Sequence, residues 1–320
     1  MSVQATRTHQ RTQEREADQA AAAVTRVWGR VDPDDIGGSW ASLVPRAATI
    51  LAASQLAAAL GATEYLDELL GMAAPAVTGI ATGALAGTAS DGRDLSTLLL
   101  QPGITTRALI RRGVPPGRAL MSGQVQLHTI ATTQTADAAR AAEQLGMAVR
   151  PRVVAYTRVV SAGACARCMV LAGREYSWST GFLRHPRCRC TMRPMRPGER
   201  VEGDDPATLF NNLSRDEQDR RFGRDGAEAI RAGADISQVV NARRGMATPQ
   251  ARYTTEGTTR RGYAGRRLGN LTTRDGRYVR SSTPRLMPDV IIREAPDRET
   301  ALRLLWEHGY LTDPPAMGDD

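Results

Sequence analysis

The stretch Cys165-Ala-Arg-Cys168, followed after sixteen residues by His185-Pro-Arg-Cys188-Arg-Cys190, holds every cysteine of this 320-residue chain. Thiolate and imidazole groups are the donors that a tetrahedral Zn²⁺ ion takes, and a C-x-x-C turn offers two sulfurs to one ion. Because the whole chain has only four cysteines and four histidines, their concentration in one window predicts a zinc site. Such a site would join two separate segments of the chain.

Five candidate ligands compete for four places. Cys165 and Cys168 supply two of the four ligands. The set is completed either by His185 and Cys188, which repeat the same spacing, or by Cys188 and Cys190. The spacing leaves both sets open. Four protein donors leave no position for a substrate or an activated water, so the sequence favours a structural zinc ion over a catalytic one. Two disulfides are the alternative. They require an oxidising compartment, and the chain begins without a cleavable apolar leader, so we expect reduced thiols in a cytoplasm.

The residues around the ligands make the pattern more specific. The first half runs Gly163-Ala-Cys165-Ala-Arg-Cys168-Met-Val-Leu-Ala-Gly173-Arg-Glu-Tyr176, and the second half runs His185-Pro-Arg-Cys188-Arg-Cys190-Thr191. In order and spacing these halves resemble the motif of phage minor head proteins of the Mu protein F-like class. Further likeness to the form found in phages of high-GC, actinobacterial hosts extends over most of the chain from about Asp91 onward.

The resemblance implies a minor capsid protein involved in head morphogenesis. It would be assembled in the host cytoplasm, lie in the interior of the phage head with portal or major capsid proteins, and accompany the DNA at ejection. No membrane partner is expected. Some relatives are described as capsid maturation proteases or are fused to one, which is the alternative function. A protease needs a nucleophile, a base and an orienting acid. The candidate bases are His9 in a terminus that we expect to fray, His128 within a helix, His185 on the metal and His308 at a helix end, and none lies in a recognisable nucleophile motif. We therefore expect no catalytic residues.

All 42 basic residues are arginine, and the formal net charge is +8. The absence of lysine excludes a P-loop lysine, a Schiff-base lysine and a serine–lysine dyad. Residues 241–287, which we call the Arg-rich segment, contain eleven arginines against Glu256 and Asp275, a local net charge of +9. This composition predicts an extended or loop-rich segment. It is either a solvated linker or an arm that contacts phosphates or an acidic protein surface. The candidate contact residues are Arg243, Arg244, Arg260, Arg261, Arg266 and Arg267.

Hydrophobic periodicity predicts helices in the N-terminal half. One runs from the N-terminus to Gly29, two more cover 43–60 and 64–70 with a break near Gly61, and a long one runs from Pro115-Pro116 to about Leu145. The Ala/Gly/Thr stretch 72–89 is too poor in large apolar residues for a membrane span and is expected to be a loop.

Strand formers at 152–160 and 173–177 flank the first cysteine pair. Further on, Ser214 with Glu217 forms a capping box, and Asp235 and Asp297 are expected to cap later helices. The sequence thus predicts a mainly helical α+β protein with five regions. These are an N-terminal helical region (1–90), a helical bundle segment (91–150), a zinc-stapled α+β domain (151–240), the Arg-rich segment (241–287), and a C-terminal helix and tail (288–320).

Overall fold

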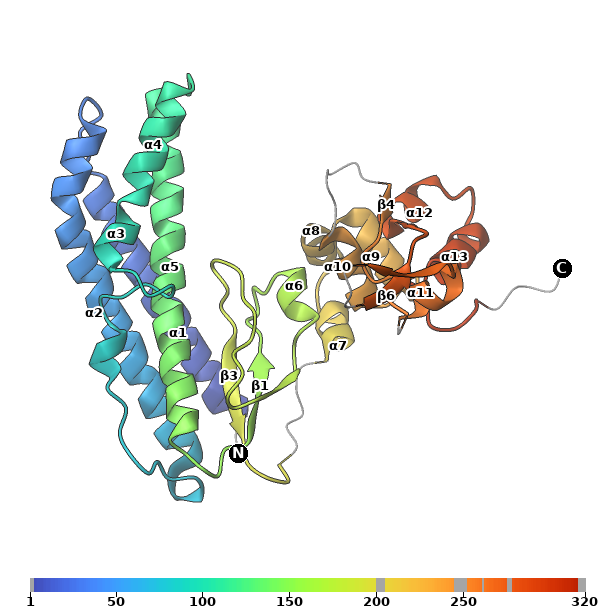
Figure 1. Cartoon of the computed structure of the whole chain (residues 1–320), viewed down its shortest axis with the longest axis horizontal. Helices are drawn as coiled ribbons and strands as arrows, with labels where there is room; N and C mark the ends of the chain where they lie inside the picture. Colours follow the sequence, from blue (N-terminus) through green and yellow to red (C-terminus); the bar gives the residue numbers. More distant parts are fainter. Residues whose placement is uncertain (1–2, 200–204, 245–251, 261, 275–277, 316–320) are drawn as a thin grey trace. The chain divides into compact units, whose positions relative to one another are not determined.

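A computed structural model of the chain describes residues 3–199, 205–244, 252–260, 262–274 and 278–315 (Figure 1). The chain divides into two compact units. The first comprises residues 1–164 and 172–203, and the second comprises residues 165–171 and 204–320. The described part is mostly helical with short strands, which confirms the predicted helical α+β class.

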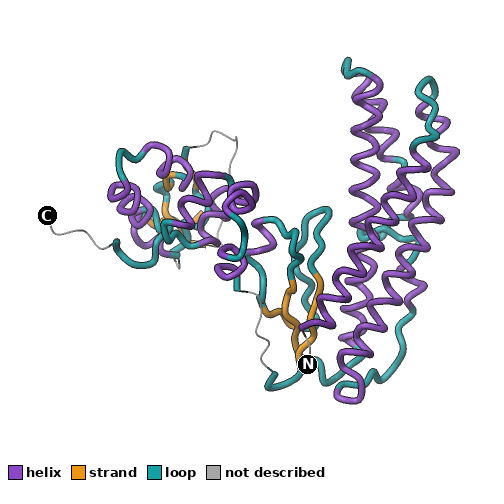
Figure 2. The backbone as a smooth tube through the Cα atoms, turned by 180° about the vertical axis from the view of Figure 1, so that it is seen from behind, coloured by secondary structure: helices purple, strands orange, loops and turns teal. Residues whose placement is uncertain are grey.

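Three long helices form the body of the first unit: α1 (Val3–Trp28), α2 (Ile36–Leu70) and α5 (Pro116–Ala148). They lie side by side in Figure 1 and Figure 2 and bury a shared core. Small residues allow close approach of the helices, and Trp28 packs edge-on against Trp40 with ring centroids 4.8 Å apart. The Trp40 indole N–H donates to the Leu99 carbonyl across 2.7 Å. The buried core includes Ala21, Val24, Trp28, Trp40, Leu51, Leu127 and Ala131.

The predicted break near Gly61 is wrong, because α2 is continuous through it. A glycine inside a helix costs only about 1 kcal/mol. The neighbouring Ala58, Ala59 and Ala62 are fully buried against alanines of α5, and this packing outweighs that cost. The same helix is long and apolar enough to cross a membrane by length and composition. In this structure it packs on α1 and α5, as core helices of that composition also do.

The stretch after α2 is irregular, as predicted. It contains the short 3₁₀ turns η1 (Gly71–Ala73) and η2 (Thr82–Leu85) and leads to α3 (Leu95–Leu99) and α4 (Gln101–Arg111). Helix α4 packs along the first turns of α5.

A three-stranded antiparallel sheet of order β2-β1-β3 packs against α1 and α5. Its strands are β1 (Ala155–Val159), β2 (Glu175–Ser177) and β3 (Thr191–Met195). Strand β1 pairs with both neighbours, so that Thr157 lies opposite Glu175 on one side and Arg193 on the other. Strands β1 and β2 fall within the predicted stretches, whereas β3 was not predicted. The turn Cys165–Leu171, which contains α6 (Ala166–Met169), continues at both ends into the segments that carry β1 and β2.

The second unit contains α7 (Pro206–Asn211), α8 (Arg215–Phe222), α9 (Arg224–Arg231), α10 (Ile236–Arg244), α11 (Tyr263–Leu268), α12 (Pro288–Glu294) and α13 (Arg298–Glu307). Two small antiparallel sheets join β4 (Tyr253–Thr254) to β7 (Arg285–Leu286), and β5 (Leu271–Arg274) to β6 (Tyr278–Ser281). The predicted side-chain caps at Ser214, Asp235 and Asp297 are confirmed, but the capping box is only half formed, because the Glu217 carboxylate pairs with Arg220 and Arg221. Ser214 accepts from the Glu217 N–H at 3.3 Å, Asp235 from Gln238 at 2.8 Å and Asp297 from Thr300 at 2.7 Å.

Candidate metal centre

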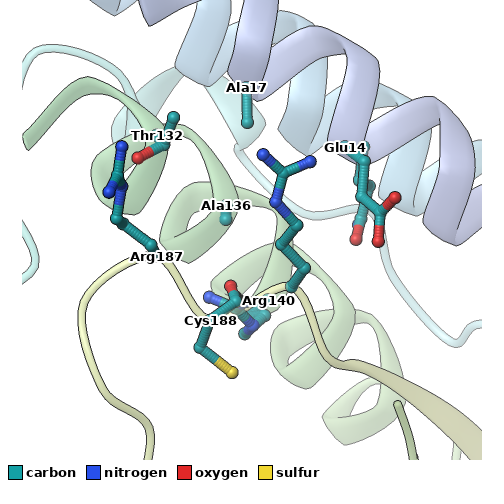
Figure 3. A pocket seen from close by; sticks show the side chains of 9 residues that line it. Glu14, Ala17, Thr132, Ala136, Arg140, Arg187 and Cys188 are labelled. Atoms are coloured by element: carbon teal, nitrogen blue, oxygen red, sulfur yellow. Dashed lines mark hydrogen bonds between the residues drawn. The ribbon is translucent and has the colours of Figure 1, made fainter. Parts of the chain in front are cut away.

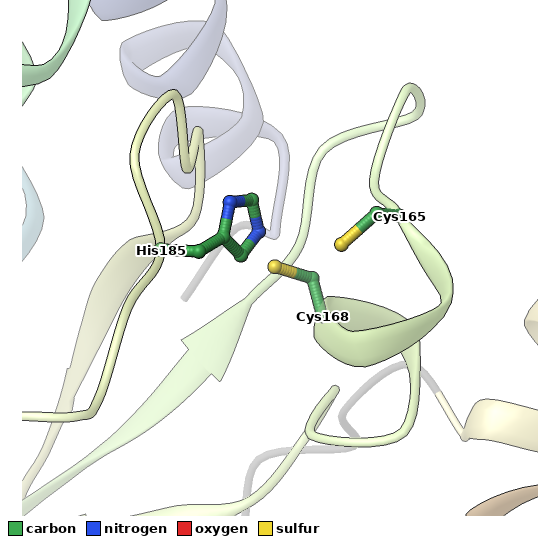
Figure 4. A group of neighbouring side chains, drawn as sticks. All are labelled: Cys165, Cys168 and His185. Carbon is green, nitrogen blue, oxygen red and sulfur yellow. The ribbon is translucent and has the colours of Figure 1, made fainter. Parts of the chain in front are cut away.

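The structure brings the five predicted ligands together in two groups that share one residue. Donor atoms of Cys165, Cys168 and His185 all lie within 4.8 Å of one another, and so do the sulfurs of Cys168, Cys188 and Cys190. Figure 4 shows the first group, with both sulfurs and the imidazole turned toward a common space. None of the four cysteines, all in the described part of the chain, forms a disulfide. Thiol and imidazole donors at this separation could hold a metal ion, and the donor chemistry suits zinc.

The first cysteine pair is positioned by a tight turn. Cys165 is the residue before α6, and its carbonyl accepts the N–H groups of Cys168 at 2.9 Å and Met169 at 3.0 Å. Gly173 then takes a positive φ of 66°, which glycine adopts without a Cβ penalty, and its N–H donates to the Arg158 carbonyl across 3.0 Å. The turn therefore places the sulfurs of Cys165 and Cys168 at one end of the connection between β1 and β2.

In the second half of the motif, a local hydrogen bond orients the histidine ring. His185 Nδ1 lies 2.7 Å from the Pro186 carbonyl oxygen. A carbonyl can only accept, so Nδ1 carries the proton and Nε2 keeps the lone pair that a metal would bind. The Cys188 N–H in turn donates to the His185 carbonyl at 3.1 Å. Arg187 between them has a φ of 63°, a conformation that non-glycine residues rarely adopt.

Arg140 of α5 holds the main chain of the second cysteine pair. Its Nε donates to the Cys190 carbonyl across 2.9 Å, one terminal nitrogen donates to the Cys188 carbonyl, and the other binds Asp137 at 2.8 Å. Arg140 and Asp137 are both buried. These contacts reach the carbonyls, so they orient the main chain of both cysteines.

Helix α1 and the middle of α5 make further contacts with the same segment. The Gln10 amide donates to the Arg189 carbonyl at 3.0 Å, and the Arg189 guanidinium forms a two-pronged ion pair with Asp18 at 2.6 and 3.0 Å. The Thr133 hydroxyl accepts the Arg187 N–H at 3.0 Å. The backbone from Arg187 to Cys190 is therefore fixed by the helices of the first unit.

A small cavity beside this segment, drawn in Figure 3, has a volume of about 10 Å³. That is room for one water molecule and not for a substrate. Glu14 faces it, and burial raises the pKa of this carboxyl while the nearby Arg189 opposes the change. The cavity is lined by Gln13, Glu14, Ala17, Thr132, Ala136, Arg140, Arg187, Cys188 and Arg189.

The histidines outside the metal motif have structural partners. The expectation that His9 lies in a frayed terminus is wrong: it is buried in α1, stacked on Tyr65 with ring centroids 4.1 Å apart, and its Nε2 lies 2.8 Å from Glu143. His128 Nδ1 contacts Arg187 at 3.0 Å, and burial, with the Arg187 charge, lowers its pKa. His308 Nδ1 accepts the Leu286 N–H at 3.2 Å.

The candidate arginines of the Arg-rich segment divide by environment. Arg243 pairs with Asp289 at 2.7 and 2.9 Å, and Arg267 donates to the Leu311 carbonyl at 2.8 Å. Arg260 and Arg266 are exposed, and the Arg266 guanidinium carbon lies 5.1 Å from the centre of the Tyr263 ring. Arg261 and the side chain of Arg244 lie outside the described part of the chain.

Sequence reasoning missed the buried charges that support the motif, although a signal for them exists. Asp137, Arg140 and Glu143 recur every third residue within an alanine-rich stretch of α5. That spacing places them along one side of a helix. All three are buried, and the carboxylate of Glu143 accepts from Thr191 at 2.6 Å and from the Met192 N–H at 3.2 Å.

A family model described as VG15 protein matches residues 1–215. The match covers the helices of the first unit, the three-stranded sheet and all five candidate ligands. No curated protein and no solved structure matches the chain. Because the matched stretch is about two thirds of the sequence, the chain belongs to the VG15 family, a family of phage proteins.

Proposed function

We propose that this protein is a minor capsid protein of the phage head, of the Mu protein F-like type, and that a structural zinc ion stabilises it. The observation that carries the proposal is the pair of candidate ligand groups around Cys168, in a chain from a phage family. The helical first unit supplies long surfaces suited to contacts with portal or major capsid proteins.

The ion would be held by donors from the two groups of three, which comprise Cys165, Cys168, His185, Cys188 and Cys190. A tetrahedral zinc site takes four donors, so four of these five residues would bind at one time. When bound, zinc would supply a permanent cross-link between the two cysteine pairs and no reaction chemistry, since four protein donors fill its coordination sphere. Binding energy of this kind adds directly to folding energy.

Three features support a structural role over a proteolytic one. The cavity beside the motif holds about one water molecule. His9 and His308 make hydrogen bonds within buried or half-buried packing. His128 contacts Arg187, and His185 belongs to the ligand cluster. A protease would need one of these rings next to an activated nucleophile.

In the head interior, the Arg-rich segment would contact packaged DNA. Arg243 and Arg267 already bind groups of their own unit. The contact would therefore fall, among the described candidates, to Arg260 and Arg266.

Mass spectrometry of particles from the phage that encodes this chain tests the proposal. We expect the protein in purified proheads and in mature virions at a fixed copy number, and at a reduced number in shells that have ejected their DNA. Elemental analysis of the purified protein is expected to find about one zinc per chain. Absence of the protein from both proheads and virions would overturn the capsid role, whatever its metal content.

A further inference from the structure

Arg158 is a buried cation beside the candidate metal centre. It lies in β1, opposite Met192 of β3, and only 2 % of its surface is exposed. Its guanidinium carbon stacks 4.3 Å from the centre of the Phe182 ring, and one terminal nitrogen donates to the Leu183 carbonyl across 3.1 Å. The guanidinium is therefore held in one orientation by contacts that do not involve the cysteines.

The other terminal nitrogen points at the second cysteine pair. Arg158 Nη2 lies 3.4 Å from Cys190 Sγ and 3.7 Å from Cys188 Sγ. Both distances suit N–H···S hydrogen bonds, and sulfur accepts such bonds best when it carries negative charge. Arg140 fixes the carbonyls of these two cysteines, while Arg158 fixes their sulfurs.

The charge of a zinc–thiolate group also requires a cation at this position. Zn²⁺ with three thiolates and one neutral imidazole carries a net charge of −1, and with four thiolates −2. A buried charge of that kind requires a compensating partner. An arginine cannot lose its proton at physiological pH, so Arg158 supplies a permanent +1 at the sulfurs.

We propose that Arg158 is a positioning residue of the metal centre: it orients the Cys188 and Cys190 sulfurs toward the ion and offsets the negative charge of the metal–thiolate group. This inference rests on the proposed zinc site. It adds a residue that is neither a ligand nor part of the ligand motif. Outer partners of this kind typically change metal affinity by about 10- to 100-fold when they are removed.

Three variants of the full-length chain test the role. Arg158→Met keeps an unbranched side chain that can still pack on Phe182 but removes the charge and the donors. Arg158→Lys keeps the charge without the planar fork. Arg174→Met is the matched control, because Arg174 is an exposed arginine in the neighbouring segment. Its main-chain carbonyl accepts the main-chain N–H of Arg158, and the substitution keeps this bond.

Zinc affinity is measured by competition with a chromophoric chelator, and the ligand field by the absorption spectrum of the Co²⁺-substituted protein. We expect Arg158→Met to bind zinc about 10- to 100-fold more weakly and to shift the sulfur-to-cobalt bands. Arg158→Lys should recover part of the affinity, and Arg174→Met should match the wild type. Urea unfolding of the metal-free proteins checks that the variant still folds.

Wild-type affinity and an unchanged cobalt spectrum in Arg158→Met would overturn the role of Arg158 while leaving the zinc site intact. If the wild type itself binds neither Zn²⁺ nor Co²⁺, this result overturns both the zinc site and the proposed role of Arg158. Should Arg158→Met not fold, Arg158→Lys decides the matter, because full affinity with an unchanged spectrum there would also overturn the proposal.

Discussion

His9 Nε2 lies 2.8 Å from Glu143 Oε1, although 134 residues separate the two in the chain. The carboxylate is fully buried and also accepts from the Gln13 amide at 2.9 Å, the Thr191 hydroxyl at 2.6 Å and the Met192 N–H at 3.2 Å. One side chain of α5 thereby joins α1 to β3. This network places the sheet, and with it the end of the metal motif, on the helices of the first unit.

Replacing Glu143 with alanine is expected to lower the free energy of unfolding by about 3–5 kcal/mol, because it leaves several buried donors without an acceptor. Urea unfolding followed by circular dichroism measures the change. The control is Glu64→Ala, an exposed glutamate of α2, for which we expect a change within about 0.5 kcal/mol. Equal effects of the two substitutions would contradict the importance of the network.

Two glycines of α5 form a second matched pair. A Cβ on Gly123 would lie 2.2 Å from the Thr106 hydroxyl and 2.6 Å from the Trp28 ring, whereas a Cβ on Gly117 would meet nothing within 4 Å. We expect Gly123→Ala to destabilise the protein by about 1–3 kcal/mol through overpacking. Gly117→Ala should be neutral or stabilising by at most about 1 kcal/mol. Thermal unfolding of both variants checks the order, and a stabilised Gly123→Ala would contradict the packing described between α1, α4 and α5.

Cys168 is the candidate ligand shared by both groups of donors. Cys168→Ser should therefore lose the metal under either ligand set. If His185 and Cys188 complete the coordination sphere, Cys190→Ser keeps the metal and His185→Gln loses it. If Cys188 and Cys190 complete the coordination sphere, Cys190→Ser loses the metal and His185→Gln keeps it. Zinc content per chain after dialysis distinguishes these cases, and a Cys168→Ser protein that retains one zinc per chain would rule out both sets.

Local signals in the sequence sufficed for the features that depend on local chemistry. Side chains of Ser214 and Asp297 cap helices because capping involves neighbours three residues away. The helix break at Gly61 was predicted wrongly because the deciding factor is the burial of adjacent alanines against α5. The residues of α5 lie far along the chain from Gly61. Strand β3 was missed because its Thr-Met-Arg-Pro-Met sequence contains a proline and only one β-branched residue, and pairing with β1 determines it.

In the candidate metal centre, too, local features could be predicted from the sequence and long-range contacts could not. The candidate ligands could be predicted from spacing, since C-x-x-C and H-x-x-C-x-C are patterns that can bind one metal ion. Arg140 and Arg158, however, reach the second cysteine pair from segments 50 and 32 residues away from Cys190. Only the packing of α5 and β1 brings them there, so a single sequence shows them merely as charges among apolar residues.

The stability of the second unit is expected to depend on pH through His308. Burial lowers the pKa of this imidazole; the nearby Glu307 carboxylate opposes the change, and the charge of Arg285 adds to it. The unfolded chain has an ordinary histidine pKa near about 6.5. As the pH falls through that value, the unfolded state takes up a proton that the folded state resists, so stability is lost toward acid. Urea unfolding at about pH 7.5 and pH 5.5 should show a larger loss in the wild type than in His308→Gln. An identical loss in both proteins would contradict a role for this histidine.

The proposed contact of the Arg-rich segment with DNA predicts how strongly DNA binding depends on salt concentration. Each phosphate neutralised by an arginine contributes about 0.9 to the slope of log K against log salt concentration. For the full-length chain on a short duplex, replacing the exposed Arg260 and Arg266 with serine should reduce that slope by about 1.8 and weaken binding to all sequences alike. The matched control replaces Arg215 and Arg220 of α8, which are exposed but pair with Glu228 and Glu217 at 3.1 and 3.2 Å. Because glutamates of α8 and α9 already pair with those two arginines, the control should keep the wild-type slope. Equal losses in both double variants would mean that net charge alone, and not a particular surface, binds DNA.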